Sequence, residues 1–227
     1  MVPDSSDATN RYLKQTRDLY GDELFLEPDT ASAENLPQAS NSDFSSDLTS
    51  FYQEIHQCQN CALGQTRTNF VFGVGDPNAS LVLVGEAPGE KEDLKGEPFV
   101  GRAGILLDKI LAAIDRTRQK DVYICNVLKC RPPNNRDPLA GEVEQCEPYL
   151  IHQINLIQPK LIVALGRVAG KTLLNVESSL KSMRGVLHDY HGTPLLVTYH
   201  PAALLRNPNW KPEAWKDFKW VRSIIDA

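Results

Sequence analysis

The stretch LVLVGEAPG, residues 81–89, decides the fold class of this chain. It is a short apolar run that ends in a loop with two glycines and a proline around one acid, Glu86. An apolar run of this length, rich in branched side chains and bounded by turn residues, is typical of a buried parallel strand. Three more such runs follow, at residues 122–124, 161–165 and 195–198.

Helical patterns separate these runs, at residues 103–114, 140–157 and 168–174. A last amphipathic segment spans residues 213–225, and its apolar residues at helical spacing are expected in the core: Trp215, Phe218, Val221 and Ile224. Asp47 is placed to cap one more helix, through Phe51 and Ile55. Strands that alternate with helices predict an α/β fold, a three-layer α/β/α sandwich with a central four-stranded parallel sheet.

Charge divides the chain of 227 residues into two parts. Residues 1–48 hold ten acids and three bases, whereas the remainder holds 19 acids and 21 bases. We expect residues 1–46 to be a disordered acidic tail, with a short helix at 10–20 and a docking motif at 24–26 as alternatives, and residues 47–227 to be the folded domain. Without a membrane-length apolar run or a secretory pattern, a cytoplasmic, nucleoid-associated protein with no membrane partner is expected.

Four of the five cysteines form a two-plus-one-plus-one set: Cys58, Cys61, Cys130 and Cys146. A Cys-x-x-Cys pair plus two distant thiolates can close one metal or iron–sulfur site. Because disulfides are rare in the cytosol, metal binding is favoured, although the cysteines alone leave zinc, a disulfide pair and a redox cluster open. The fifth, Cys125, lies inside an apolar run and is predicted to be a core thiol.

Polar side chains follow the predicted strands at the edge where parallel strands bind ligands. Glu86 follows the first strand, Asn126 the second, Arg167 the third and His200 the fourth. Each alone is more often a turn or surface residue, but their convergence favours an active site. The other histidines lack such a setting and are predicted to lie on the surface: His56, His152, His188 and His191.

Two loops accompany these strand ends. In residues 96–104, Gly101 and Gly104 suit a helix start with exposed N–H groups, which is an anion site, and Phe99 is either a core residue or a stacking ring. The amide of Asn126 presents a donor beside an acceptor, which matches the imide edge of a pyrimidine. The second loop carries three bases that would contact phosphate at the mouth of a cleft: Lys129, Arg131 and Arg136.

Together these segments resemble the family 4 uracil-DNA glycosylases, the iron–sulfur branch of the uracil-DNA glycosylase superfamily. The resemblance runs from Cys58 to the C-terminal helix and is carried by residues 85–89, 98–101, 126–133 and 200–201. It implies a base excision repair enzyme that flips uracil out of single- or double-stranded DNA and hydrolyses the N-glycosidic bond, leaving an abasic site. A monomer is expected, whose tail could bind a repair or replication partner.

The resemblance also implies roles for single residues. Glu86 would position or activate water, and His200 would hydrogen-bond the uracil O2 and stabilise the leaving anion. The base would further be contacted by Gly85, Ala87, Phe99 and Asn126. DNA would be held by a wedge at Leu204 or Leu205 and by phosphate contacts from Arg206 or Arg131. The cofactor would be a 4Fe-4S cluster on Cys58, Cys61, Cys130 and Cys146.

Three departures from the wider superfamily bear on mechanism. Ala87 stands where the best-known branch has an Asp, which leaves Glu86 as the nearby carboxylate. Gly89 stands where that branch has a Tyr that blocks the thymine methyl group. No His lies between Cys130 and Cys146, which excludes the branch that cross-links to DNA through a His in this loop. One alternative is a non-catalytic iron–sulfur or zinc nucleic-acid-binding protein, which is disfavoured because Glu86, Asn126 and His200 are expected at one sheet edge. Another is an electron-transfer protein, which is disfavoured because the folded part is not strongly acidic and carries glycosylase-like motifs.

Overall fold

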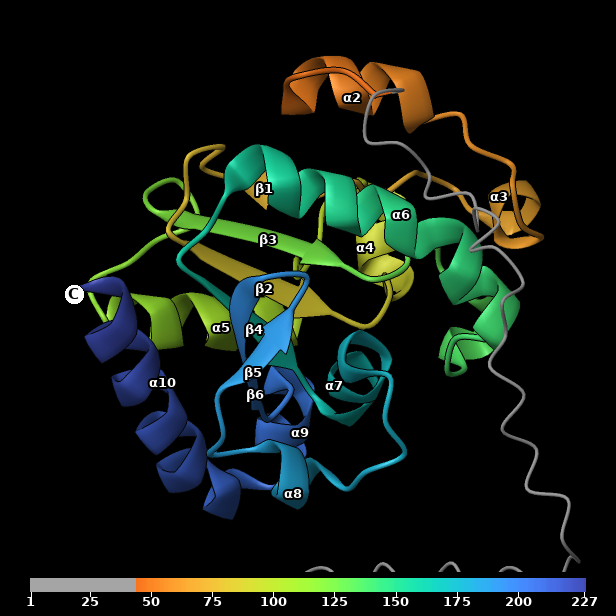
Figure 1. Cartoon of the computed structure of the whole chain (residues 1–227). Coiled ribbons are helices and arrows are strands. Elements are labelled where there is room, and N and C mark those ends of the chain that lie inside the picture. The colour runs from red at the N-terminus through yellow and green to blue at the C-terminus, as the bar shows by residue number, and fades with distance from the viewer. Residues whose placement is uncertain (1–43) are drawn as a thin grey trace, which may run out of the picture. The chain divides into compact units, whose positions relative to one another are not determined.

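The computed structural model describes residues 44–227 (Figure 1). The predicted tail, with its alternatives at 10–20 and 24–26, therefore lies outside the described residues except for positions 44–46. The division into tail and domain stays a prediction. Among the helices of residues 44–227, none combines the length and the apolar character that a membrane crossing requires.

A six-stranded sheet, in the order β1-β3-β2-β4-β6-β5, lies at the centre of the described part. Its strands are β1 (Val74–Gly75), β2 (Leu81–Gly85), β3 (Val122–Asn126), β4 (Leu161–Leu165), β5 (His188–Tyr190) and β6 (Thr193–Thr198). The four predicted strands form the parallel centre, whereas β1 and β5 pair antiparallel at the two edges. The predicted count of four was too low because β1 has only two residues and β5 carries no apolar run.

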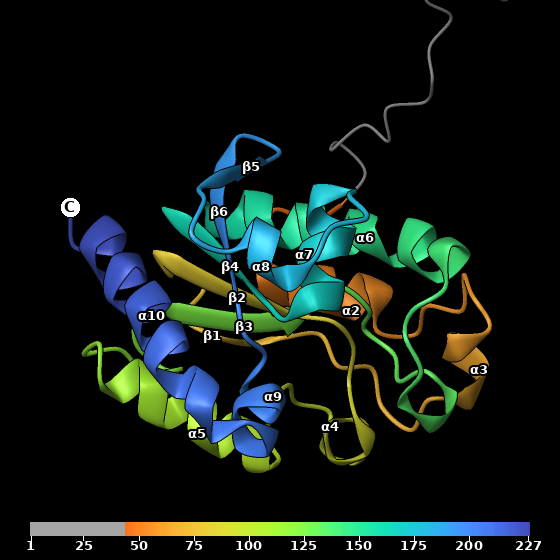
Figure 2. The ribbon, with the colours of Figure 1, turned by 90° about the horizontal axis from the view of Figure 1, so that it is seen from below.

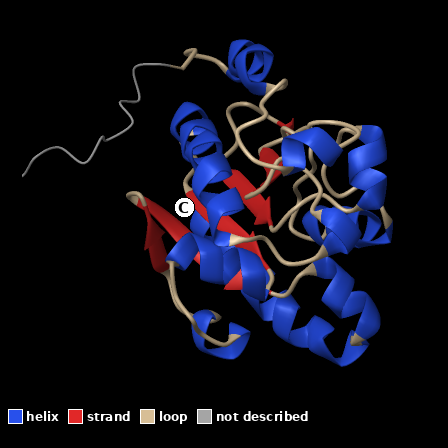
Figure 3. Ribbon diagram, turned by 90° about the vertical axis from the view of Figure 1, so that its right-hand side faces the viewer, coloured by secondary structure: helices blue, strands red, loops and turns tan. Residues whose placement is uncertain are grey.

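Alternate residues of the central strands point to opposite faces of the sheet and meet different helices. Val82 and Val84 share a core with α2 (Leu48–Ile55), α6 (Ala140–Ile157) and α7 (Arg167–Leu174). Leu81 and Leu83 share a second core with α5 (Arg102–Ala112) and α10 (Lys211–Ile225). Helices therefore cover both sides of the strands (Figures 2 and 3), and the predicted three-layer sandwich is confirmed.

The helix boundaries follow local signals closely. Asp47 caps α2 as predicted, because its carboxylate accepts from the N–H groups of Thr49 at 2.9 Å and Ser50 at 3.0 Å. On α10 the prediction for Trp215 was wrong: this side chain is 39% exposed, and Ala214 takes the inward position. Short helices that periodicity missed are α3 (Leu63–Thr66), α4 (Glu90–Lys95), α8 (Leu180–Met183) and α9 (Pro201–Arg206), with 3₁₀ turns at Pro133–Asn135 and Pro208–Trp210.

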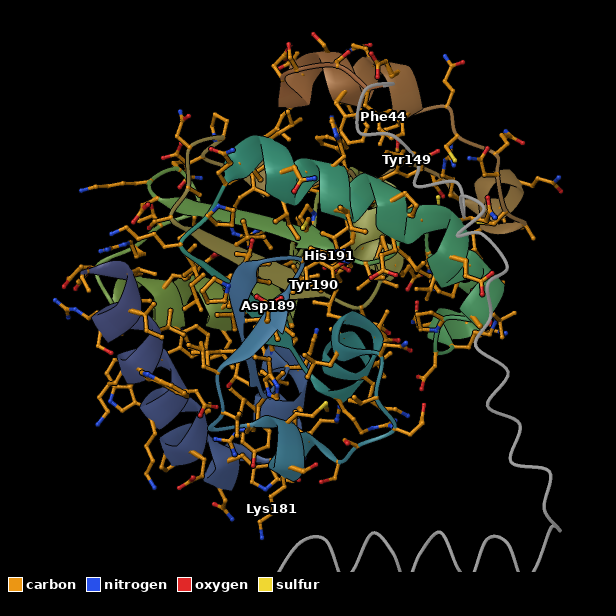
Figure 4. All side chains as sticks on the ribbon, viewed as in Figure 1. Phe44, Tyr149, Lys181, Asp189, Tyr190 and His191 are labelled. Atoms are coloured by element: carbon orange, nitrogen blue, oxygen red, sulfur yellow. The ribbon has the colours of Figure 1, made fainter. Side chains whose placement is uncertain are left out.

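An aromatic cluster joins α2 to α6. Phe44 lies beside Tyr149 (Figure 4), with ring centroids 5.9 Å apart, and it contacts Phe51 at 5.0 Å. His152 is only 6% exposed, and its Nε2 lies 2.9 Å from the carbonyl oxygen of Ser45. The prediction that His152 is a surface residue was therefore wrong, because α2 covers this side of α6.

Candidate active site

A pocket of about 680 Å³ lies where the parallel strands end. Glu86 follows β2, Asn126 ends β3 and His200 follows β6, and all three line this pocket together with Phe99. Its volume is in the range of small-ligand sites, roughly 300–1,000 Å³. The structure thus brings Glu86 and His200 to one place with three of the four expected base contacts, Ala87, Phe99 and Asn126. Arg206 is also on the wall, whereas Gly85 is not among the lining residues.

Gly85 allows Asn126 and Phe99 to come close together. A Cβ at Gly85 would lie 2.3 Å from Asn126 Oδ1 and 2.9 Å from Phe99 Cε2. Asn126 is 2% exposed and pairs in register with Gly85. Its backbone carbonyl accepts from Lys129 Nζ at 2.8 Å. Its side chain is part of the pocket lining. A buried amide in this position can exchange two hydrogen bonds with a planar ligand.

Phe99 adopts a backbone conformation that bulky residues avoid, with φ of 54°. Arg118 holds it there by donating to the carbonyl of Pro98 at 2.8 Å and to that of Phe99 at 2.6 Å. Gly104 permits the arrangement, since a Cβ there would lie 1.6 Å from Phe99 O. Strained residues persist only where their surroundings fix them, so this loop is built to present the Phe99 ring.

Glu92 fixes the same loop from the other side. Its Oε1 accepts from the N–H groups of Val100 at 3.0 Å and Gly101 at 3.2 Å. Gly101 precedes α5, so the anion site predicted at this helix start is present but is filled by the carboxylate of Glu92. In this structure the carboxylate of Glu92 therefore braces the loop that carries Phe99.

Because the resemblance implies that Phe99 stacks on the base, we expect Arg118→Ala to weaken substrate binding. Without Arg118 the strain at Phe99, about 1–3 kcal/mol for such a conformation, can relax and move the ring. The KM for a uracil-containing oligonucleotide should rise about tenfold with a smaller change in kcat, since ~1.4 kcal/mol is tenfold in affinity. Steady-state kinetics measure this, with Arg222→Ala, an exposed ion-paired arginine on α10, as the matched control. Equal KM values in both variants would remove Arg118 from this role.

His200 is held as a neutral hydrogen-bond donor. Burial, with a smaller effect from the charge of Arg206, lowers its pKa to about 4, against an opposing effect of Glu92. Its Nδ1 lies 3.1 Å from the N–H of Ala202 and accepts from it, so the single proton of the neutral ring is on Nε2. Gly166, with φ of 102°, makes room, because a Cβ there would lie 3.0 Å from His200 Cβ. The ring lies 5.4 Å from that of Phe99.

Glu86 has the properties of a base poised near neutrality. Burial is the main cause that raises its pKa to about 7, with Asp137 adding to the rise and Arg167 opposing it. A carboxylate tuned to this range can hold or deprotonate water at physiological pH. Burial thus raises the pKa of Glu86 and lowers the pKa of His200. Such shifts are common at catalytic sites.

The predicted DNA contacts differ in their exposure. Leu204 is 1% exposed and packed in the interior, so Leu205, which is half-buried, is the one of the two that can reach a duplex. Arg206 is exposed on the pocket wall, whereas Arg131 lies outside the pocket lining and donates to Asn135 at 2.8 Å.

The other two predicted phosphate contacts both have protein partners. Lys129 is 0% exposed, and its Nζ donates to Asn126 O and to Gln153 Oε1, so the prediction of a phosphate contact was wrong for this residue, whose side chain braces the loop after β3 from inside. Arg136 is paired with Glu142 at 2.5 and 2.8 Å but also lines the pocket, so its phosphate contact stays a prediction.

The four cysteines of the predicted metal set line one cavity: Cys58, Cys61, Cys130 and Cys146. Cys125 does not line it and is 1% exposed, so its prediction as a core thiol is confirmed. Within residues 44–227 no group of three or more His, Cys, Asp or Glu side chains is arranged to hold a single metal ion. The four thiols nevertheless border one common space.

The donor set around this cavity fits an iron–sulfur cluster. Arg67 Nη1 lies 3.2 Å from Cys130 Sγ, the backbone N–H of Lys129 lies 3.3 Å from Cys146 Sγ, and Tyr149 Oη lies 3.3 Å from Cys58 Sγ. Hydrogen bonds to ligand sulfurs are one of the means by which proteins tune such clusters. The loop that carries Cys130 is also linked to the pocket at the strand ends, because Lys129 bonds Cys146 through its backbone and Asn126 through its side chain.

A second hollow, of about 780 Å³, adjoins the pocket at Arg167 and Val168. This hollow is larger than the pocket, but acidic residues outnumber the lysine and arginine residues on its walls. The acidic residues are Asp137, Glu144, Glu147 and Glu177. It contains none of the polar strand-end residues Glu86, Asn126 and His200. We therefore place the chemistry in the pocket at the strand ends.

The sequence did not reveal the roles of Glu92 and Arg118. Glu92 stands three residues after Gly89 at the start of a helix, which marks it as a possible cap but not as a brace for a distant loop. Arg118 is 19 residues from Phe99 and its contact depends on the turn after α5. Only the folded chain reveals that contact.

Comparisons with known proteins agree with this geometry. A family model described as the uracil DNA glycosylase superfamily matches residues 72–219. A Type-4 uracil-DNA glycosylase from Archaeoglobus fulgidus is 47% identical over 185 residues, which cover 78% of this chain and 92% of that protein. A Type-4 uracil-DNA glycosylase from Sulfurisphaera tokodaii is 45% identical, covering 78% of this chain and 84% of that protein. One from Thermotoga maritima is 45% identical, with 68% and 81% covered.

Proposed function

Since the chain belongs to the uracil-DNA glycosylase superfamily, we propose that the pocket at its strand ends is the active site at which uracil is excised from DNA. The chain is a uracil-DNA glycosylase, a DNA repair hydrolase that acts on N-glycosyl bonds. The observation that carries the assignment of the site is the meeting of Glu86, Asn126 and His200 in one pocket beside a strained aromatic ring.

Uracil enters the pocket as a base extruded from the stack, because its reacting atoms are out of reach inside a duplex. Phe99 stacks on the ring, and the strain held by Arg118 and Glu92 keeps that ring in place before the base arrives. The amide of Asn126 reads the O4 and N3–H edge, with Lys129 fixing its backbone from below. The backbone near Gly85 and Ala87 would contribute N–H groups to the same ligand, and Ala87 lines the pocket.

The chemistry is a hydrolysis in which the C1′–N1 bond breaks and a water oxygen bonds to C1′. The electron pair of the broken bond stays on uracil, and the negative charge reaches O2. His200, neutral and with its proton on Nε2, donates to O2 as this charge develops. Glu86 holds the water and takes its proton, so that the sugar receives a hydroxyl and the DNA is left with an abasic site.

This division of roles predicts the pH dependence. Glu86 must be ionised to hold and deprotonate water, and its pKa is raised to about 7, so the single-turnover rate should fall as the pH drops below about 7 and level off above it. His200 titrates only near 4, so it adds no second limb in this window. Rates measured from about pH 5 to about pH 9 test this, with Glu86→Gln as the comparison. A slow but flat profile is expected for Glu86→Gln; a wild-type profile that is flat through pH 7 contradicts the assignment.

We propose that Cys58, Cys61, Cys130 and Cys146 hold a 4Fe-4S cluster. The proposed hydrolysis has no redox step, so the cluster would supply rigidity: its ligands would join the segment between α2 and α3, and α6, to the loop that carries Lys129 and Arg131. Its effect on catalysis would run through Lys129, which contacts both Cys146 and Asn126.

The partner is uracil-containing DNA, with Leu205 as the wedge and Arg206 or Arg131 on phosphate. One copy of the chain contains every residue of the site, so we propose a monomer as the active unit. Residues 1–46 are proposed as an acidic tail that can bind a repair or replication partner. Action on chromosomal DNA would place the enzyme in the cytoplasm with the nucleoid.

The test of the function is release of free uracil from defined oligonucleotides. Single-stranded, U:A and U:G substrates should yield uracil and an abasic site, whereas thymine should not be released and hypoxanthine measures the breadth of the pocket. DNA binding without release of any base would favour the alternative of a non-catalytic nucleic-acid-binding protein.

A further inference from the structure

A stack of side chains stands at the rim of the pocket, outside the residues that contact the base. The indole of Trp210 lies on the ring of Tyr199, with centroids 5.1 Å apart and planes 21° apart. The guanidinium of Arg184 contacts the same Tyr199 ring, 4.2 Å from its centroid. Tyr199 directly precedes His200, so this stack begins one residue from the proposed catalytic donor.

The inner end of this stack is held firmly. Arg184 forms two hydrogen bonds with Asp217 of α10, at 2.9 and 3.0 Å, and one with the carbonyl of Glu213 at 3.1 Å. Asp217 also accepts from Thr198 Oγ1 at 2.6 Å, at the end of β6. Arg184 and Asp217 are nearly buried, with side chains 12% and 11% exposed. The stack is therefore anchored to both a strand and a helix of the core.

The outer end is open to the pocket. Trp210 is 41% exposed and lines the same pocket as His200 and Arg206. It closes the turn Pro208–Trp210, in which a proline limits the backbone, directly before α10. One face of the indole is thus held by the ring of Tyr199, while the side chain borders the same pocket as Arg206.

We propose that Trp210 is a stacking platform for a nucleobase adjacent to the extruded uracil on the same DNA strand. A base has a flat face that matches the indole, and Arg206 is positioned to meet the neighbouring phosphate. Stacking of this kind tolerates any base sequence, because every base has a π-face. The proposal rests on the proposed function, since it takes uracil in the pocket as its point of reference.

The test measures binding without chemistry. The probe is a single-stranded oligonucleotide with one 2′-fluoro-2′-deoxyuridine, whose glycosidic bond resists hydrolysis, and full-length protein is titrated into it. Trp210→Ala should raise the Kd by about 5- to 100-fold, the range expected for loss of one base–aromatic stack. Trp210→Phe should recover most of the affinity. Trp215→Ala, a tryptophan 39% exposed on α10 that does not line the pocket, should bind as wild type does.

Removal of the base from the DNA isolates the contact. Two further probes carry a stable abasic analogue on the 5′ or the 3′ side of the fluorinated uridine. On one of these two probes, the wild type should bind as weakly as Trp210→Ala binds the probe with all its bases. On that same probe Trp210→Ala should bind little more weakly than the wild type, so the effects of the substitution and of the missing base are far from additive. The side on which this occurs gives the direction of the strand across the pocket.

Three outcomes would overturn the platform: unchanged binding by Trp210→Ala, an equal loss in Trp215→Ala, or additive losses with both abasic probes. A wild-type protein that releases uracil yet shows one of these results retains its function and loses only this site. A wild-type protein that neither binds the fluorinated probe nor releases uracil overturns the proposed function, and the platform with it.

Discussion

His200→Ala lowers the single-turnover rate of uracil excision about 10²–10³-fold, the loss measured when a single preorganised donor to a developing oxyanion is removed. The physical reason is that His200 is already neutral and already oriented: burial holds its pKa at about 4, and the N–H of Ala202 occupies Nδ1. No reorganisation is needed as charge moves onto uracil. The affinity for DNA should change little, because the donor is used most strongly in the transition state.

Rapid-quench measurement with enzyme in excess over a uracil oligonucleotide gives this rate directly. His200→Gln should recover part of the rate, since its amide can still donate a hydrogen bond. His188→Ala is the matched control, a half-buried histidine on the edge strand β5 that lies outside the pocket lining. If His200→Ala and His188→Ala cleave equally fast, the donor has been assigned to the wrong residue.

The proposed 4Fe-4S cluster should give the purified protein a brown chromophore, and we expect Cys130→Ser to lose this colour and to destabilise the fold by more than about 4 kcal/mol, the magnitude typical of losing a metal site. The cause is topological, because the cysteines join residues 58–61 to the loop before α6 and to α6 itself. Without the cluster, buried thiols would remain: burial raises the pKa of Cys130 and raises that of Cys146 to about 12.

Absorption spectra, iron content and urea unfolding measure the two effects separately from activity. Cys125→Ala is the matched control, because Cys125 is as deeply buried as any cysteine in the described part but does not line the cavity. It should keep its colour and iron content. Retention of iron by Cys130→Ser, or its loss from Cys125→Ala, would contradict the proposed ligand set.

Much of the fold follows from local patterns. The four parallel strands and the long helices are marked by apolar runs and by helical spacing, and α6 spans the residues expected for it. The edge strands are different, because β1 and β5 are defined by hydrogen bonds to a neighbour and carry no apolar signature of their own. Trp215 was misplaced since one helical turn offers several apolar positions and packing decides among them.

In the candidate site too, some residues could be predicted from the order of the strands, and others are positioned by contacts that only the folded chain reveals. Glu86, Asn126 and His200 were found because parallel strands deliver their ends to one edge, which is a rule of topology. The burial of Lys129 and Leu204 and the brace from Arg118 to Phe99 depend on contacts between distant segments, which no spacing reveals. The raised pKa of Glu86 likewise depends on burial in the folded chain.

The most direct test is the single-turnover release of uracil by the wild type and by the Glu86→Gln, His200→Ala double variant, both shown to have the same absorption spectrum and the same unfolding midpoint. The wild type should release all the uracil, while the double variant should bind the same oligonucleotide with similar affinity and release uracil at least 10²-fold more slowly. Release at the wild-type rate by the double variant would contradict the account, because the chemistry would then lie outside the pocket at the strand ends.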